Sequence, residues 1–199
     1  CFEGLKAFRH TDGSIKIFRL NSSVTRMMQS SKQLSLPNID VELTRQMVVD
    51  IVSRFTHAVP EPPGSMYIRP THMGTEATIG KAADASATSI LFILLSPVGD
   101  YFSVSSNALR LMLEVDEMRC APHMGMIKTG GNYASALRPI TAARQSFQAD
   151  QVLFCPAGDV QETGAANFIL IDDGEIITKA LDRTFLHGIT RDSVLTLAR

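Results

Sequence analysis

The sequence contains few cysteines, almost no net charge and no apolar run long enough to cross a bilayer. Cys1, Cys120 and Cys155 have neither an even count nor the spacing of metal ligands, which argues against a disulfide framework or a zinc site. The formal net charge of -1 offers no general attraction for nucleic acid or a membrane surface. The best apolar candidate, residues 89–98, is about half of the roughly 20 residues that a spanning helix needs. It is therefore predicted to be a buried strand, and no metal is expected.

The remaining composition is that of an ordinary globular protein. Of 199 residues, 45% are hydrophobic and 20% are charged, and this length allows one domain or two modest ones. The chain opens at Cys1 inside a predicted strand and closes at Arg199 within a helical pattern that has no glycine stop. We expect a chain truncated at both ends. We also expect a cytoplasmic protein, or one from a mitochondrial or plastid matrix if a transit peptide is missing.

The first part of the chain has the patterns of strands and helices without regular alternation. A hairpin is predicted around the turn at Thr11–Ser14, and a helix is expected to begin at a capping Ser22 or Ser23. A second helix is predicted over 41–56, with one buried stripe of six apolar residues: Leu43, Met47, Val48, Ile51, Val52 and Phe55. Three strands are predicted to follow, at 65–72, 88–97 and 107–115. This order indicates an α+β fold.

The pattern weakens between Asp116 and Gly131, where we place a domain junction. The sequence predicts a small N-terminal α+β domain over 1–118, an interdomain loop over 119–130 and the start of a larger C-terminal domain over 131–199. Clefts between domains are preferred ligand sites. The elements predicted in the second part are a helix over 133–147, strands at 151–156, 167–172 and 175–180, and a helix from Thr190.

Lys128 lies between the apolar run 124–127 and two glycines, with Asn132 and Tyr133 immediately behind. The stretch is not a Walker A loop, because Ile127 occupies the position of that motif's glycine. Two interpretations remain. Lys128 is either a Schiff-base lysine, which must be neutral part of the time, or a lysine in an exposed loop.

Two features further along the chain suit charged ligands, the first a cationic group and the second an anionic group. Glu162 stands just before a glycine and an apolar strand, where it is either a solvated turn residue or a buried anion facing a cation such as a protonated pyridine. The hydroxyl of Thr190 can cap a helix that begins at Arg191. The start of a helix exposes backbone N–H groups that suit a phosphate, although every helix has such an end.

Two arginines in the first part each have two possible roles. Arg26 lies on a mostly buried helix, so it points either inward at an anion or outward to solvent. Tyr67 and Arg69 are two apart on a strand and share one face. They suit recognition of a carboxylate, and a cross-strand surface pair is equally compatible with the pattern.

Taken in order, seven motifs resemble the branched-chain amino acid aminotransferases, which are pyridoxal phosphate (PLP) enzymes of fold type IV in the class IV aminotransferase family. The motifs are FEGLKAFR, FRLNSSVTRMMQS, YIRP, SPVGDYF, IKTGGNYAS, QETGAANF and HGITRDS. The resemblance implies a two-domain fold like that of D-amino acid aminotransferase, with PLP between the domains, and a homodimer. It also implies reversible transfer of the amino group of L-Leu, L-Ile or L-Val to 2-oxoglutarate.

The resemblance assigns roles to individual residues. Lys128 resembles the catalytic lysine that forms the Schiff base with PLP and later moves a proton at the substrate. Glu162 resembles the partner of the pyridine nitrogen, Tyr133 the residue that binds the phenolic oxygen, and Leu186 a residue packed near the ring. The phosphate would be held by Arg26, Ile189 and Thr190. The residues implied to line the substrate pocket or its mouth are Phe2, Tyr67 and Arg69.

Other functions stay open at this point. A D-amino acid aminotransferase, an (R)-amine transaminase and an aminodeoxychorismate lyase share the fold and would all keep Lys128 and Glu162. An inactive fragment that retains the scaffold is a further alternative. His187 stands where the resembled family usually has proline, which predicts a less rigid loop. The motifs FEGLKAFR, YIRP and SPVGDYF favour branched-chain substrates.

Overall fold

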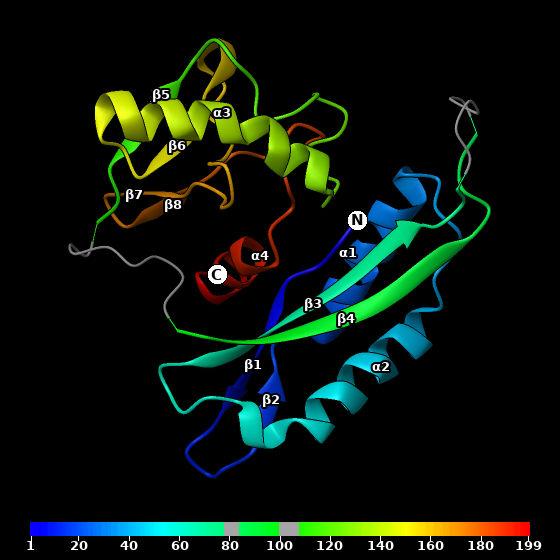
Figure 1. Cartoon of the computed structure of the whole chain (residues 1–199). Helices are drawn as coiled ribbons and strands as arrows, with labels where there is room; N and C mark the ends of the chain where they lie inside the picture. Colours follow the sequence, from blue (N-terminus) through cyan, green and yellow to red (C-terminus); the bar gives the residue numbers. More distant parts are fainter. Residues whose placement is uncertain (78–83, 100–107) are drawn as a thin grey trace. The chain divides into compact units, whose positions relative to one another are not determined.

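The structure is a computed structural model that describes residues 1–77, 84–99 and 108–199 (Figure 1). The chain divides into two compact units, Cys1–Ser103 and Val104–Arg199. This division lies earlier than the junction predicted at 119–130. The reason is that the strand expected to end the first domain, β5 (Leu111–Glu114), pairs with β6 (Gln151–Phe154) in the second unit. The first residue of that predicted strand and part of the SPVGDYF motif lie outside the described residues.

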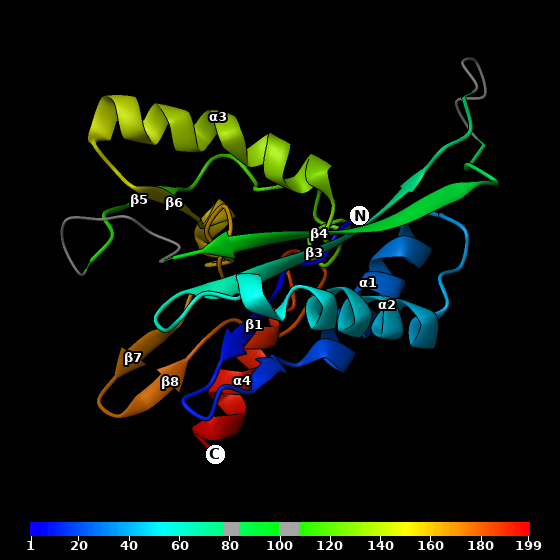
Figure 2. The same ribbon diagram turned by 60° about the horizontal axis from the view of Figure 1, so that its bottom comes forward.

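The first unit is built on an antiparallel sheet with the strand order β2-β1-β3-β4. The predicted hairpin is present, and its turn uses Gly13 at a φ of 81°, a conformation that glycine adopts without a steric cost. Figure 2 shows β3 and β4 running side by side as the longest pair. The strands are β1 (Leu5–Arg9), β2 (Ile15–Ile17), β3 (Ser65–Gly74) and β4 (Ser89–Val98).

Two helices, α1 (Leu20–Gln33) and α2 (Val41–Arg54), follow the hairpin, and a 3-10 turn, η1 (Thr56–Ala58), follows α2. The predicted serine caps of α1 are wrong, because the helix begins earlier, after Arg19 in a left-handed conformation with a φ of 47°. Asp40 caps α2 and accepts a hydrogen bond from the Leu43 N–H at 2.8 Å. This cap is worth about 1 kcal/mol.

The core of the first unit lies between the sheet and the helices. Val48 and Val52 of α2 pack against the inward residues of β1 and β3: Leu5, Ala7, Met66 and Ile68. The predicted stripe on α2 is correct only in part, because Leu43 and Phe55 are exposed. The buried line runs instead through Thr44, Val48 and Val52, which are four residues apart and face the sheet together.

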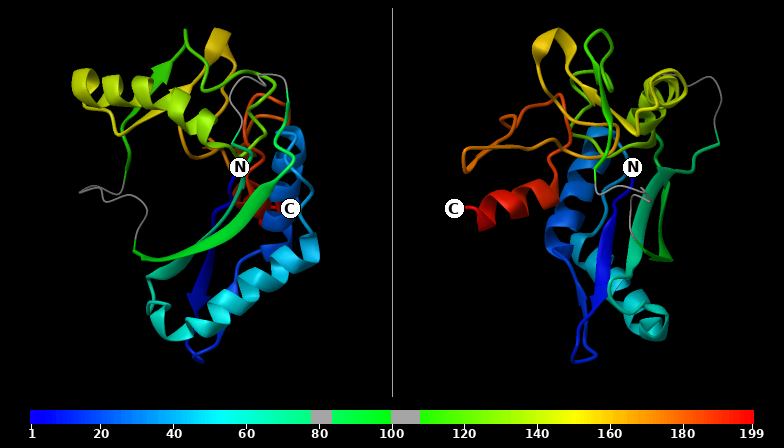
Figure 3. Two further views of the ribbon diagram at one scale, coloured as in Figure 1. Left: turned by 45° about the vertical axis from the view of Figure 1, so that its right-hand side comes forward. Right: turned by 90° about the vertical axis from the view of Figure 1, so that its left-hand side faces the viewer.

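The second unit contains a strand–helix–strand crossover followed by a hairpin and a last helix. The parallel pair β5–β6 is joined by α3 (Gly130–Phe147), which lies beside it in the left view of Figure 3. Ala136 and Ala143 of α3 pack on Val152 and Phe154 of β6. The remaining elements are η2 (Pro156–Gly158), β7 (Leu170–Asp172), β8 (Glu175–Ile177) and α4 (Ile189–Leu197).

The starts of both long helices in the second unit differ from the predictions. The helix expected at Tyr133 begins at Gly130, and α4 begins at Ile189 after Gly188 as its N-cap, so Thr190 is not the cap. Within the described residues, no helix is long and apolar enough to span a membrane. The same residues contain no group of histidine, cysteine, aspartate and glutamate side chains that could hold a metal ion.

Candidate functional site

The loop that carries Lys128 is held against the start of α3 by Asn132. The buried Asn132 amide donates to the carbonyl oxygens of Met124 at 2.7 Å and Ile127 at 2.9 Å. The side chain of Ile127 is buried as well. Because both sides of the loop are fixed, Lys128 has a defined place immediately before the first turn of the helix.

Lys128 and Tyr133 are in direct contact. The half-buried Lys128 Nζ donates a hydrogen bond to Tyr133 Oη at 2.6 Å and lies 5.0 Å from the centroid of the same ring. A lysine that is only a solvated loop residue would not make this partly buried hydrogen bond, so the contact disagrees with that interpretation of Lys128. An amine and a phenol are therefore presented together at the helix start.

Glu162 is a buried anion and not a solvated turn residue, since it is 2% exposed. Its Oε1 accepts from the Leu186 N–H at 2.9 Å, and its Oε2 accepts from Asn167 Nδ2 at 3.1 Å. Arg119 Nη1 lies 3.0 Å from Oε1 as an ion-pair partner. A buried carboxylate needs such partners, because an unpaired charge away from water is very costly.

Arg119 is a site residue that the sequence analysis missed. It is 2% exposed, and its Nε donates to the Gly164 carbonyl oxygen at 3.3 Å. Its guanidinium carbon lies 5.1 Å from the centroid of the Tyr133 ring. Arg119 thus joins Glu162 to Tyr133. It falls in a stretch without helical or strand periodicity, so no pattern in the sequence marked it as buried.

The predicted residues near α4 belong to the same unit, and Leu186 among them contacts the cluster directly. Besides its N–H bond to Glu162, Leu186 accepts at its carbonyl oxygen from Asn167 Nδ2 at 2.8 Å. Ile189 and Thr190 form the first turn of α4. A helix start carries a partial positive charge, which suits an anionic group.

Asp182 organises the loop that leads into α4. It accepts from the Thr184 N–H at 2.8 Å and the Thr184 hydroxyl at 2.6 Å, and Lys179 Nζ lies 2.9 Å away. Burial raises the pKa of Asp182, but the Thr184 hydrogen bonds and the Lys179 charge outweigh it and lower the pKa to about 2. His187 Nε2 lies 2.7 Å from the Asp182 carbonyl oxygen. A hydrogen bond thus restrains the loop at the position where branched-chain aminotransferases usually have proline.

In the first unit, Arg26 points inward and meets a carboxylate of its own chain. Its Nε and Nη2 donate to the two oxygens of Glu3 at 2.8 and 2.7 Å, a bidentate pair. Glu3 is 1% exposed, and the sequence analysis gave it no role. The role of Arg26 in binding a phosphate stays a prediction.

The three residues predicted to contact substrate come together in the first unit. Arg69 Nη2 donates to Tyr67 Oη at 2.8 Å, and its guanidinium lies 4.7 Å from the centroid of the Phe2 ring. Tyr67 and Arg69 project from the same face of β3, as their spacing predicts. They form a cluster with one cation and two aromatic rings.

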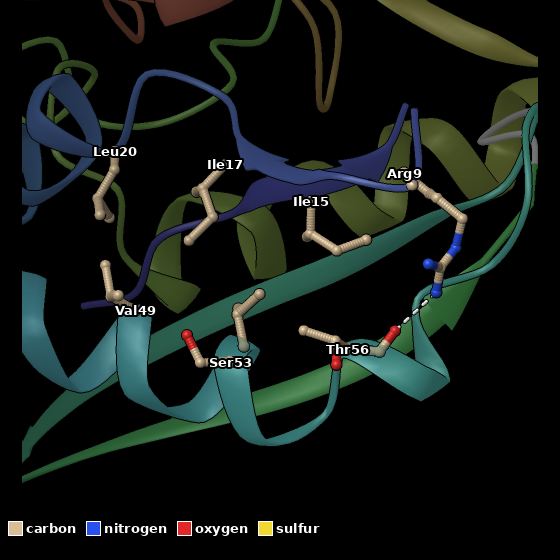
Figure 4. Close-up of a pocket in the computed structure, with 9 residues that line it drawn as sticks. Arg9, Ile15, Ile17, Leu20, Val49, Ser53 and Thr56 are labelled. Carbon is tan, nitrogen blue, oxygen red and sulfur yellow. Dashed lines mark hydrogen bonds between the residues drawn. The ribbon is translucent and has the colours of Figure 1, made fainter. Parts of the chain in front are cut away.

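A separate groove of about 620 Å³ lies between the β1–β2 hairpin and α2, and Figure 4 shows its lining. Its walls are largely aliphatic, with Ile15, Ile17 and Val49 among them. Its charged lining residue, Arg9, donates to the Thr56 carbonyl oxygen at 2.7 Å. The groove contains none of the predicted site residues. The cluster around Lys128 and Glu162 therefore remains the candidate site.

The family described as Amino-transferase class IV matches residues 1–199. The chain belongs to this family. The chain is 36% identical, over 207 residues, to the mitochondrial branched-chain-amino-acid aminotransferase of Saccharomyces cerevisiae; the match covers all of the chain and 52% of the relative. The chain thus spans about half the length of the curated relatives that it matches.

Solved structures agree with the family. The branched-chain aminotransferase of Thermoproteus uzoniensis, solved with norvaline, has a TM-score of 0.82 and 26% identity, covering 99% of this chain and 64% of that one. The T.th. branched-chain amino acid aminotransferase, solved with pyridoxamine 5'-phosphate, has a TM-score of 0.77 and 25% identity, covering 99% and 63%. The predicted α+β fold of type IV is confirmed.

Proposed function

We propose that this protein is a PLP-dependent aminotransferase that transfers the amino group of L-Leu, L-Ile or L-Val reversibly to 2-oxoglutarate. One observation carries the proposal: in a class IV aminotransferase chain, Lys128, Tyr133 and the buried Glu162 are linked through Arg119 into one cluster. The branched-chain substrates are supported by the names of its relatives in yeast and Thermoproteus uzoniensis.

The groups present in the second unit suit PLP chemically. An aldehyde calls for a primary amine, a pyridinium nitrogen calls for a carboxylate, and a phosphate calls for backbone N–H groups at a helix start. Lys128, the buried Glu162 and the first turn of α4 supply these three. When bound, PLP supplies a ring that withdraws electrons from the carbon that exchanges its amine.

Each of the predicted site residues has a role in this proposal. The Lys128 amine would hold the cofactor's aldehyde group and would move a proton at the substrate's α-carbon, while the Tyr133 hydroxyl accepts a hydrogen bond from Nζ and holds it in place. Glu162 would hold the protonated ring nitrogen through its carboxylate, and Leu186 would pack near the ring. The first-turn residues Ile189 and Thr190 would hold the phosphate, and we propose the same role for Arg26 of the first unit.

For the substrate side, we propose that Phe2 and Tyr67 border the pocket for the aliphatic side chain. Arg69 would bind the second carboxylate of glutamate, since its planar guanidinium suits a carboxylate. We further propose a homodimer, and a cytoplasmic protein or one of an organelle matrix. The three free cysteines support a reducing compartment.

Covalent trapping tests the role of Lys128. The protein is mixed with PLP, reduced with borohydride and digested, and the modified peptide is identified by mass spectrometry. We expect one pyridoxyl group on Lys128, none after Lys128→Ala, and an unchanged label in the control Lys32→Ala, which alters a lysine on α1. Undiminished labelling of Lys128→Ala would show that the assignment is wrong.

A panel of amino donors tests the substrate class. We expect L-Leu, L-Val and L-Glu to convert bound PLP to its amino form, and D-Ala and an aryl amine to leave its absorbance unchanged. Conversion by D-Ala or by the aryl amine alone would instead support one of the rival transaminases. Labelling of Lys128 without conversion by any donor would support an inactive scaffold.

A further inference from the structure

Arg119 is the most buried cation of the candidate site, and none of the roles above uses it. It belongs to the stretch between β5 and α3, and the Ser135 hydroxyl of α3 donates to its carbonyl oxygen at 2.5 Å. The backbone of Arg119 is thereby anchored to the helix that carries Tyr133. Its guanidinium then spans to Glu162, which follows β6.

Among its contacts, Arg119 makes an ion pair with Glu162 and a cation–π contact with Tyr133. Its Nη1 lies 3.0 Å from Glu162 Oε1, although it is not aligned as a hydrogen-bond donor to a described atom. With both partners 2% exposed, the ion pair is screened little by water. The guanidinium plane also contacts the Tyr133 ring, which a lysine's compact ammonium would do less well.

Tyr133 contacts two cations. Lys128 Nζ and the Arg119 guanidinium lie 5.0 and 5.1 Å from its ring centroid, and both distances are within the range of a cation–π contact. Tyr133 is hydrogen-bonded to the Lys128 amine, and Arg119 is ion-paired with the Glu162 carboxylate. A change at Arg119 therefore acts on both groups that we assign to the cofactor ring.

We propose that Arg119 is a positioning residue: it fixes the Glu162 carboxylate and the Tyr133 ring relative to each other, so that both meet one cofactor ring. This inference rests on the proposed function, since it concerns the same site. Arg119 acts through its two neighbours and makes no contact with substrate in this role.

The first test uses the apoprotein and a thermal double-mutant cycle. Arg119→Met leaves the buried Glu162 without this counter-charge, so we expect Tm to fall by roughly 10 °C. Glu162→Gln in the same chain removes the charge that Arg119 compensates, so the double variant should recover part of that loss. The control Arg138→Met alters an exposed arginine of α3 and should leave Tm unchanged. Strictly additive losses would show that the pair is not coupled.

The second test measures the Kd for PLP and the circular dichroism of the bound cofactor's visible band, which reports a fixed ring orientation. We expect Arg119→Met to weaken PLP binding on the order of 10- to 100-fold and to reduce the band. The double variant should bind PLP more tightly than the product of the two single losses predicts, because part of the effect of Arg119 acts through Glu162. Arg119→Lys, which keeps the charge and loses the planar fork, should restore Kd in part and the band less.

The outcomes separate this inference from the proposed function. Unmodified wild-type protein in the borohydride experiment would overturn the proposed function, and a coupled thermal cycle in that case would assign the pair to the fold of the second unit alone. Labelled wild-type protein together with an unchanged Kd and an unchanged band in Arg119→Met would overturn the positioning role and leave the proposed function standing.

Discussion

At the scale of single residues, Glu3 and Arg26 form an ion pair with unequal burial, with exposed fractions of 1% and 12% for their side chains. Arg26→Met leaves the less accessible partner without its counter-charge, so we expect the free energy of unfolding to fall by about 3–5 kcal/mol. Glu3→Gln should cost less, because the Arg26 side chain keeps a larger exposed fraction than Glu3 and so more contact with water. Urea denaturation measures both, with the exposed Arg45→Met as the control. A larger loss in Glu3→Gln would contradict the burial argument.

Asp182 gives a prediction for the pH dependence of stability. Its pKa in the folded protein is about 2, below the usual 3.8, so folding favours the ionised form. The stabilisation is complete above pH ~4 and is lost as pH falls toward 2. Because the side chain is 41% exposed, solvent screening reduces the effect, and we expect Asp182→Asn to cost about 1 kcal/mol at pH 7.

The measurement for Asp182 compares the unfolding free energies of wild-type protein and Asp182→Asn at pH 7, 4 and 2.5. The difference should shrink at the lowest pH, since the wild-type carboxyl then approaches the neutral state of the amide. A difference that stays constant over this range would show that the loop is held by shape and not by charge. Asp173→Asn, in the β7–β8 turn, serves as the control.

The sequence alone indicates some residues of the candidate site by their type and their neighbours. The lysine beside two glycines and the glutamate before an apolar strand both stand out locally, and the structure connects them through Arg119. Glu3 and Arg119 do not stand out, because their importance comes from partners that lie 23 and 43 positions away in the chain. Local patterns contain no information on such pairs.

At the scale of elements, the loop before α3 packs closely on the loop before α4. A Cβ at Gly125 would collide with the Thr184 carbonyl group and the Phe185 nitrogen. Backbone atoms cannot swing aside, so we expect Gly125→Ala to cost about 1–3 kcal/mol and to lower Tm. Gly131→Ala, in the open first turn of α3, should be neutral or stabilising by up to about 1 kcal/mol. Equal Tm values for the two variants would disprove the close packing.

The elements themselves were largely predictable, and their starts were not. Apolar spacing and the turn at Gly13 indicate the hairpin and helices correctly, because these signals are local. The starts of α1 and α4 were misplaced because their N-caps, Arg19 and Gly188, have no capping side-chain bond to recognise. On α2, the face that meets the sheet depends on packing, so sequence spacing alone selected Leu43 as buried.

At the scale of the whole molecule, the two units have separate apolar cores. Val48 belongs to the first and Val152 to the second, and both are fully buried. We expect Val48→Ala and Val152→Ala each to cost about 2 kcal/mol through the lost contacts and the cavity. Hydrogen exchange should show the loss of protection mainly in the unit that carries the substitution. Equal loss in both units would mean that they unfold as one cooperative body.

The domain boundaries at 118 and 131 stay a prediction, and the two compact units of the structure divide earlier, between Ser103 and Val104. β5 looks like one more strand of the first unit until its partner is known, and that partner begins at Gln151, opposite Leu111. Strand pairing over such a distance leaves no periodic signal. The motifs identified the family correctly because they test many positions jointly, which periodicity does not.

The parallel β5–β6 pair has a consequence for how freely this sequence could vary. Lys128 follows the carboxyl end of β5 and Glu162 follows the carboxyl end of β6, and parallel neighbours have these ends at the same edge, about 4.8 Å apart. The long separation of the two residues in the chain is taken up mainly by α3. Whole turns could therefore be added to or removed from the far end of that helix during evolution, or by an engineer inserting a tag, while the amine and the carboxylate keep their neighbourhood.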